Sequence, residues 1–79
     1  MLQELKVDNV DYIKKYYSDN GINTLGKTLK NGYPGNNILH EAIAHKSEKV
    51  IDFILENKTD LDTKNIDGNT PLHIAVLNG

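Results

Sequence analysis

The 79-residue sequence contains no cysteine, so it can form neither a disulfide framework nor a thiolate metal site. It also has no apolar run approaching the roughly 18–20 residues of a transmembrane helix, and its start is too polar for a signal peptide. All nine basic residues are lysines, without a basic block, and they stand against eleven acidic residues for a net charge of −2. This balance argues against nucleic acid or membrane as a partner. We expect a cytoplasmic protein, or one in the host-cell cytoplasm if its source is a parasite or virus.

Signals of catalysis or metal binding are equally scarce. No serine lies in a Gly-x-Ser-x-Gly elbow, and the glycines near Gly35 are not followed by the Lys-Ser/Thr pair of a phosphate-binding loop. His40 and His45 resemble a zincin helix, but five residues of helix place them about 140° apart, whereas that site needs a spacing of four. We therefore expect no enzyme activity, and no catalytic, cofactor-binding or metal-binding residue.

What the sequence does contain is an internal repeat. Residues 67–75 read Asp-Gly-Asn-Thr-Pro-Leu-His-Ile-Ala, and residues 35–42 preserve its Gly-x-x-x-Leu-His-x-Ala frame. The two copies are 33 residues apart, and this offset pairs Leu39 with Leu72, His40 with His73, and Ala42 with Ala75. A period of about 33 residues with Thr-Pro-Leu-His at a helix start is typical of ankyrin repeats. The chain thus resembles the ankyrin-repeat family.

The resemblance implies an all-α solenoid of stacked helix-turn-helix units joined by β-turn or hairpin loops. We expect one domain, residues 1–79, that opens with an irregular unit and ends in mid-repeat. Its parts are an irregular N-terminal unit at 1–21, a connector and hairpin at 22–36, a complete repeat at 37–66, and the first half of a further repeat at 67–79.

Capping residues predict where the helices begin. In the first unit, Asp8 is the expected cap of a second helix that stops at Asn20-Gly21. In the complete repeat, Asn37 is expected to cap a helix to about residue 45, and Ser47 the next helix, to about residue 57. Lys46 and Lys58 stand at turns where left-handed backbone is expected.

The final motif is interpreted as structural. Thr70 is expected to cap the last helix, Pro71 to occupy its first position, and His73 to return a hydrogen bond to Thr70. Leu72 is expected to point into the stack, with small Ala75 allowing close helix approach.

Function follows from the resemblance: ankyrin repeats generally bind proteins through hairpin tips and the concave face of their first helices. Tyr33 and Ile66, large apolar groups at equivalent tip positions, are the favoured pair. The acidic row Glu48, Asp52 and Glu56 is interpreted as a solvated outer face, not a docking ridge. The candidate partner-binding residues are Tyr33, Pro34, Asn36, Ala44, His45, Lys64, Ile66, Asp67, Asn69, Leu77 and Asn78.

Two interpretations of the function stay open. In the first, the chain is a non-catalytic module that docks a partner protein, a host protein if the source is a parasite or virus. In the second, it is the N-terminal portion of a longer ankyrin array whose specificity lies further on. The last helix carries apolar residues on more than one side, so we also expect either self-association through it at high concentration or fraying of residues 70–79 in the monomer.

Overall fold

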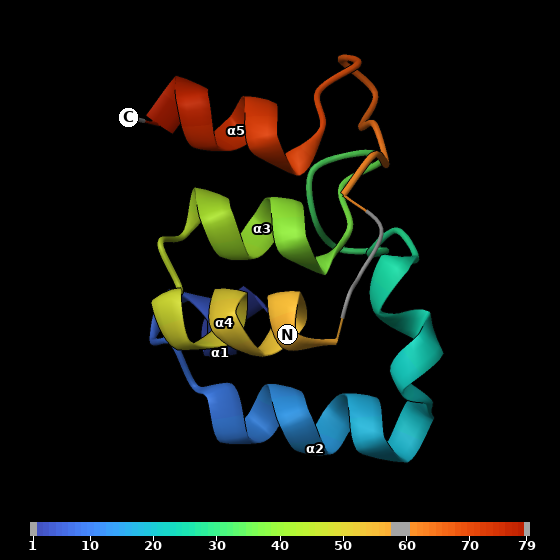
Figure 1. The fold of residues 1–79 in the computed structure, drawn as a ribbon, viewed down its shortest axis with the longest axis vertical. Coiled ribbons are helices and arrows are strands. Elements are labelled where there is room, and N and C mark those ends of the chain that lie inside the picture. Colours follow the sequence, from blue (N-terminus) through green and yellow to red (C-terminus); the bar gives the residue numbers. More distant parts are fainter. Residues whose placement is uncertain (1, 58–60, 79) are drawn as a thin grey trace.

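A computed structural model describes residues 2–57 and 61–78, and this part of the chain is helical (Figure 1). Its elements connect through short turns and one isolated antiparallel bridge, between Thr28 and Asn37. None of its helices has the length and apolar character needed to cross a membrane. The elements are α1 (Leu2–Lys6), α2 (Val10–Asn20), the 3-10 helix η1 (Ile22–Gly26), α3 (Ile38–Ala44), α4 (Glu48–Glu56) and α5 (Pro71–Asn78).

The helices stack in two rows. The first helix of each unit, α1, α3 or α5, contacts its counterpart in the next, while α2 and α4 pack together as the second row. In Figure 1 the long axis is vertical, with α5 at the top, α3 beneath it and α2 at the bottom. This arrangement is the expected all-α solenoid.

The helix α3 lies at the centre of the stack, in contact with α1, α4, α5 and η1. Its first five residues, Ile38 to Ala42, are all buried. Two residues of α4, Val50 and Ile54, join them in the core, because their spacing of four places both on one side of a helix. The remaining core side chains are Leu5, Ile13, Tyr17 and Leu25.

The start of α2 differs from the prediction. Asn9, and not Asp8, caps this helix: its side-chain oxygen accepts the backbone N–H of Tyr12 at 3.2 Å. Asp8 adopts a left-handed backbone conformation, with φ of 54°, and its carboxylate accepts the N–H groups of Lys49 and Val50 at 3.1 Å. Asp8 therefore caps α4, a helix of the next unit.

This exchange explains a second difference. Ser47 precedes α4 as predicted, but its side chain makes no capping bond to that helix. Its buried hydroxyl donates a hydrogen bond to the carbonyl of Leu5 instead. Because Asp8 of the first unit accepts the first N–H groups of α4, the Ser47 hydroxyl is available to bond to the first unit at Leu5.

Other local predictions are confirmed. Asn37 caps α3, and its side chain accepts the N–H of His40 while the His40 ring accepts the N–H of Asn37. Gly21 follows α2 with a φ of 95°, and Lys46 has the expected left-handed φ of 58°. Lys58, the other predicted left-handed lysine, lies outside the described residues.

The connector at 22–36 has more structure than its polar composition suggests. It begins with η1, which buries Leu25 in the core. It then runs antiparallel to the start of the next unit, where the N–H of Leu29 donates to the carbonyl of Asn36 at 2.8 Å. One buried leucine therefore anchors a segment that lacks helical periodicity.

The prediction that Leu72 points into the stack is wrong. Its side chain is 70% exposed, whereas its repeat counterpart Leu39 is 1% exposed. The reason is that α3 has neighbours on several sides, while α5 packs chiefly against α3. Val76 and Leu77 are exposed on α5 as well. Identical motif positions therefore differ in burial because their neighbours differ.

This difference predicts unequal effects of the same substitution. We expect Leu39→Ala to lower the free energy of unfolding by about 2–4 kcal/mol, because it leaves a cavity in a packed core. Leu72→Ala should change it by less than about 0.5 kcal/mol, since the side chain is already in solvent. Urea unfolding followed by circular dichroism measures both. Equal losses would show that Leu72 is buried in solution.

Candidate protein-interaction surface

Two loops project from the stack at the same edge, and we call them the first tip (residues 33–36) and the second tip (residues 65–69). The first tip is a turn in which the N–H of Asn36 donates to the carbonyl of Tyr33 at 2.9 Å. Gly35 supplies the positive φ, 83°, that this turn needs. The second tip uses Gly68, with φ of 79°, in the same way.

Asn65 shapes the second tip from within. Its side-chain oxygen accepts the N–H groups of Asp67 and Asn69, both at 3.0 Å. Its backbone N–H donates to the carbonyl of Asn69 at 2.9 Å, which closes the loop. Asparagine favours such turns because its side chain bonds to the backbone two residues further on.

The two tips are bonded to each other. The Tyr33 hydroxyl donates to the Asp67 carboxylate at 2.6 Å, and this bond raises the pKa of Tyr33 above its ordinary value. The Ile66 N–H donates to the carbonyl of Pro34 at 3.0 Å. At Gly35 a Cβ atom would lie 2.8 Å from the second tip's backbone, so no other residue fits this approach. The tips therefore form one surface.

A layer of buried polar side chains supports that surface. The Asn36 amide donates to the Glu41 carboxylate, and Asn65 donates to the Asn36 side-chain oxygen at 2.9 Å. Glu41 is only 6% exposed, and its other oxygen lies 3.9 Å from the ring of His45. Asn36 was a candidate for partner contact, but its side chain is interior and fastens one tip to the other.

His40 ties the second tip to α3. Its Nδ1 accepts the N–H of Asn37 at 3.0 Å, so Nε2 carries the proton and donates to the carbonyl of Asn69 at 2.8 Å. His73 repeats the first of these bonds with Thr70, as predicted, at 3.0 Å. Within the described residues, Nε2 of His73 forms no bond equivalent to the one between His40 Nε2 and the Asn69 carbonyl.

Between the tips and the first helices runs a groove of about 360 Å³. Seven of the sequence-predicted candidates line it: Tyr33, Asn36, Ala44, Asp67, Asn69, Leu77 and Asn78. The other four, Pro34, His45, Lys64 and Ile66, do not line the groove. Of these, Ile66 is 69% exposed on the second tip.

Three lining residues were not predicted: Glu41, Asn65 and Ile74. Asn65 had a sequence signal, because an asparagine two residues before the tip sequence Asp67-Gly68 favours a side-chain-closed turn. Glu41 had none, because a carboxylate within a helical segment is normally assigned to solvent. Its burial depends on Asn36, which only the folded loop brings near.

This surface offers hydrogen-bonding and apolar groups rather than reactive ones. Its titratable side chains, Tyr33, Glu41 and Asp67, are each paired with another side chain. Across residues 2–57 and 61–78, no three histidine, aspartate or glutamate side chains are grouped so that they could hold a metal ion. The arrangement is suited to contact with another macromolecule.

Comparison with known proteins agrees with this geometry. A family model described as ankyrin repeats (many copies) matches residues 39–79, more than half of the chain. The match begins at the second residue of α3 and includes α4, the second tip and α5. No solved structure matches the chain significantly.

The two histidines provide a test of the link between α3 and the second tip. We expect His40→Ala to lower the free energy of unfolding by about 2–4 kcal/mol, because it leaves a cavity and an unpaired N–H at Asn37, and it removes the bond to the Asn69 carbonyl. His73→Ala should cost about 1 kcal/mol or less, since it removes only an exposed capping interaction. Urea unfolding of both variants measures the difference. Similar losses would contradict a special role for the His40–Asn69 bond.

Proposed function

Because the chain belongs to the ankyrin-repeat family, whose members generally mediate protein–protein interactions, we propose that it is a non-catalytic module that binds a partner protein through its two tips and the adjoining groove. We place this activity in the cytoplasm, or in the host-cell cytoplasm if the source is a parasite or virus. The observation that carries the proposal is the hydrogen bond between Tyr33 and Asp67, which joins equivalent tips of successive repeats.

The bonds between the tips favour binding by reducing its entropic cost. A loop that is ordered only in the complex loses conformational freedom on association, and this loss subtracts from the affinity. Here the Ile66 N–H, the Tyr33 hydroxyl and the Asn65 amide all bond to the other tip. The surface is therefore arranged before a partner arrives.

The composition of the surface also suits a protein partner. Tyr33 is 49% exposed and Ile66 69% exposed, so each can bury further apolar area on association. The groove beside them combines Ile74 and Leu77 with the amides of Asn69 and Asn78. Mixed apolar and hydrogen-bonding groups, with an aromatic anchor, are typical of protein interfaces.

Site-specific photocrosslinking in source-cell lysate tests the binding face. A photoreactive phenylalanine analogue replaces Ile66 in one variant and Asp52, on α4, in a matched control. We expect the Ile66 position to yield a discrete adduct and the Asp52 position to yield none. Adding Tyr33→Ala to the first variant should abolish the adduct, because the aromatic anchor and its bond to Asp67 are lost.

Calorimetry with the captured protein then compares affinities. Tyr33→Ala and Ile66→Ala should weaken binding more than alanine substitutions of Glu48, Asp52 or Glu56. Adducts from position 52, or larger losses from the three acidic residues, would move the binding face to the outer row of helices. Circular dichroism of each variant confirms that the fold is retained.

The exposed face of α5 supports a second proposal, that the chain is the N-terminal part of a longer array. Leu72, Val76 and Leu77 are all more than two-thirds exposed. Solenoids cover such a face with a further repeat, and specificity would then lie downstream. In the 79-residue chain, we propose that a second copy covers it. A two-fold pairing of α5 with α5 buries the same residues on both copies.

Sedimentation velocity from micromolar to millimolar concentration tests this pairing. We expect a concentration-dependent dimer that Val76→Lys abolishes, because it places a charge in the apolar contact. Ser18→Lys, on the exposed surface of α2, makes the same charge change and should leave the dimer intact. A monomer at millimolar concentration with strong amide-exchange protection through Val76 would rule out the pairing.

A further inference from the structure

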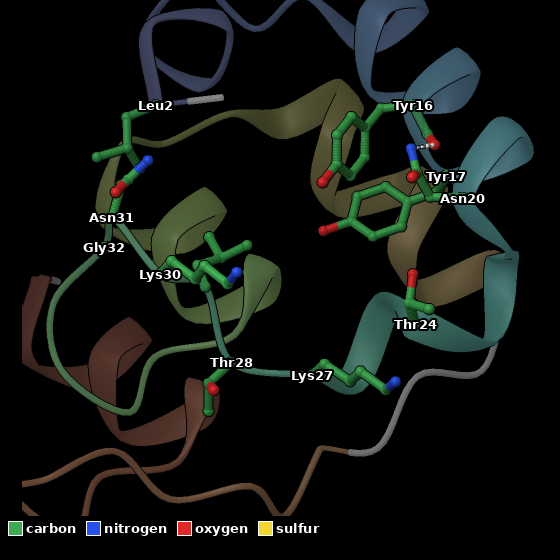
Figure 2. A pocket seen from close by; sticks show the side chains of 11 residues that line it. Leu2, Tyr16, Tyr17, Asn20, Thr24, Lys27, Thr28, Lys30, Asn31 and Gly32 are labelled. Atoms are coloured by element: carbon green, nitrogen blue, oxygen red, sulfur yellow. Dashed lines mark hydrogen bonds between the residues drawn. The ribbon is translucent and has the colours of Figure 1, made fainter.

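A second hollow lies at the N-terminal end of the molecule and shares no lining residue with the groove between the tips. It has a volume of about 420 Å³, within the range of pockets that hold small molecules. Its walls come from α2, η1 and the loop at residues 27–32, with Leu2 of α1 at one side (Figure 2). We call it the N-terminal pocket.

Tyr17 is the feature that distinguishes this pocket from a surface depression. Its side chain is 2% exposed, and Figure 2 shows its hydroxyl pointing into the pocket toward Lys30. The ring is buried, but the hydroxyl itself is accessible and has no hydrogen-bond partner among the described residues. The Tyr16 ring lies edge-on to it, with centroids 5.0 Å apart, and holds it in place. An ordered, free donor therefore faces the pocket.

The charges around the pocket have one sign. Lys27 and Lys30 line it, and no aspartate or glutamate is among its described lining residues. Thr24 and Asn20 use their donors internally, on the carbonyls of Gly21 and Tyr16, at 2.7 and 2.8 Å. The Thr28 hydroxyl and the Asn31 amide also line the pocket, but its only charged donors are the two ammonium groups, beside the tyrosine hydroxyls. A ligand that matches them must accept hydrogen bonds and carry negative charge.

The remaining lining is apolar. Leu2, Leu29 and the two tyrosine rings are among the lining residues. Burial, with a smaller contribution from Tyr16, raises the pKa of Tyr17 to about 12, so its hydroxyl keeps its proton at neutral pH, where a carboxylate is ionised. An inorganic anion would lose its hydration against this apolar wall without gaining contacts in return. An organic anion could place its apolar body against the wall and keep its charged group near the lysines.

We propose that the N-terminal pocket binds a small organic carboxylate. The carboxylate accepts hydrogen bonds from the Tyr17 hydroxyl and the Lys30 ammonium group, with Lys27 adding charge, while an aromatic or aliphatic body lies against Leu29 and the tyrosine rings. The pocket is separate from the protein-binding surface, so its occupancy does not depend on the function proposed above.

Three probes separate the parts of this proposal in an NMR titration of the 79-residue chain. Phenylacetate carries both charge and body, phenylacetamide keeps the body without the charge, and acetate keeps the charge without the body. We expect phenylacetate to shift the amide signals of residues 24–32 at millimolar concentration. The dissociation constants of the two other probes should be about tenfold higher or more. Phenylacetamide loses a charge-assisted hydrogen bond, and acetate loses the burial of its apolar body.

Matched variants identify the groups responsible. Tyr17→Phe removes only the hydroxyl and should weaken phenylacetate binding about fivefold, and Lys27→Met with Lys30→Met should weaken it about tenfold. The controls, Tyr12→Phe and Lys49→Met, change the same residue types outside the pocket and should leave affinity unchanged. Amide spectra of the free variants confirm that each retains its fold.

Several outcomes would overturn the proposal. The absence of saturable shifts with phenylacetate would show that the pocket binds no such ligand. Equal affinity for phenylacetamide would exclude recognition of the charge, and equal affinity for acetate would exclude a role for the apolar body. If Tyr12→Phe weakened binding as much as Tyr17→Phe, the site would lie on the outer surface of α2.

Discussion

Both nitrogen atoms of the His40 ring form hydrogen bonds, and each bond fixes a different part of the molecule. Nδ1 holds the start of α3 at Asn37, and Nε2 holds the carbonyl of Asn69 in the second tip. Because α5 begins at Pro71, directly after that tip, the ring also determines where α5 lies against α3. The groove, the joined tips and the exposed face of α5 all follow from this placement.

The polar layer beneath the tips shows why the surface has a defined shape. Apolar packing accepts many arrangements of similar energy, whereas buried amides and carboxylates lose stability in any arrangement that leaves them unpaired. Asn36, Glu41 and Asn65 satisfy one another only when the two loops lie in register. The exposed residues Tyr33 and Ile66 therefore rest on a base with one preferred geometry.

The sequence was sufficient to predict the repeat and the positions of the main helices, because these depend on local caps and on a 33-residue period. The candidates that line the groove came from the family resemblance, and their role in binding stays a prediction. The sequence was insufficient where two adjacent residues could each cap a helix, and where the burial of a side chain depended on elements distant in the sequence. Asp8 and Asn9 are both good caps, and only the nearby N–H groups of Lys49 and Val50 decide their roles. Leu39 and Leu72 occupy the same motif position, yet the number of adjacent helices decides which is buried.

The N-terminal pocket was unpredictable for a related reason. The ring of Tyr17 is buried in the core, but no local sequence pattern shows where its hydroxyl points. The loop opposite, at residues 27–32, has no periodic pattern that places Lys30 near that hydroxyl. Only η1, anchored by Leu25, brings the loop across α2.

The carboxylate of Asp8 has a consequence for the order of folding. A short helix such as α4 is unstable alone, and its first turn lacks partners until Asp8 arrives from the preceding unit. In a solenoid whose units are locally complete, folding can nucleate in any unit and propagate. Here the second unit depends on the first for its cap, while the hydroxyl of Ser47 satisfies the Leu5 carbonyl in return. We therefore expect the two units to fold and unfold together as one cooperative unit.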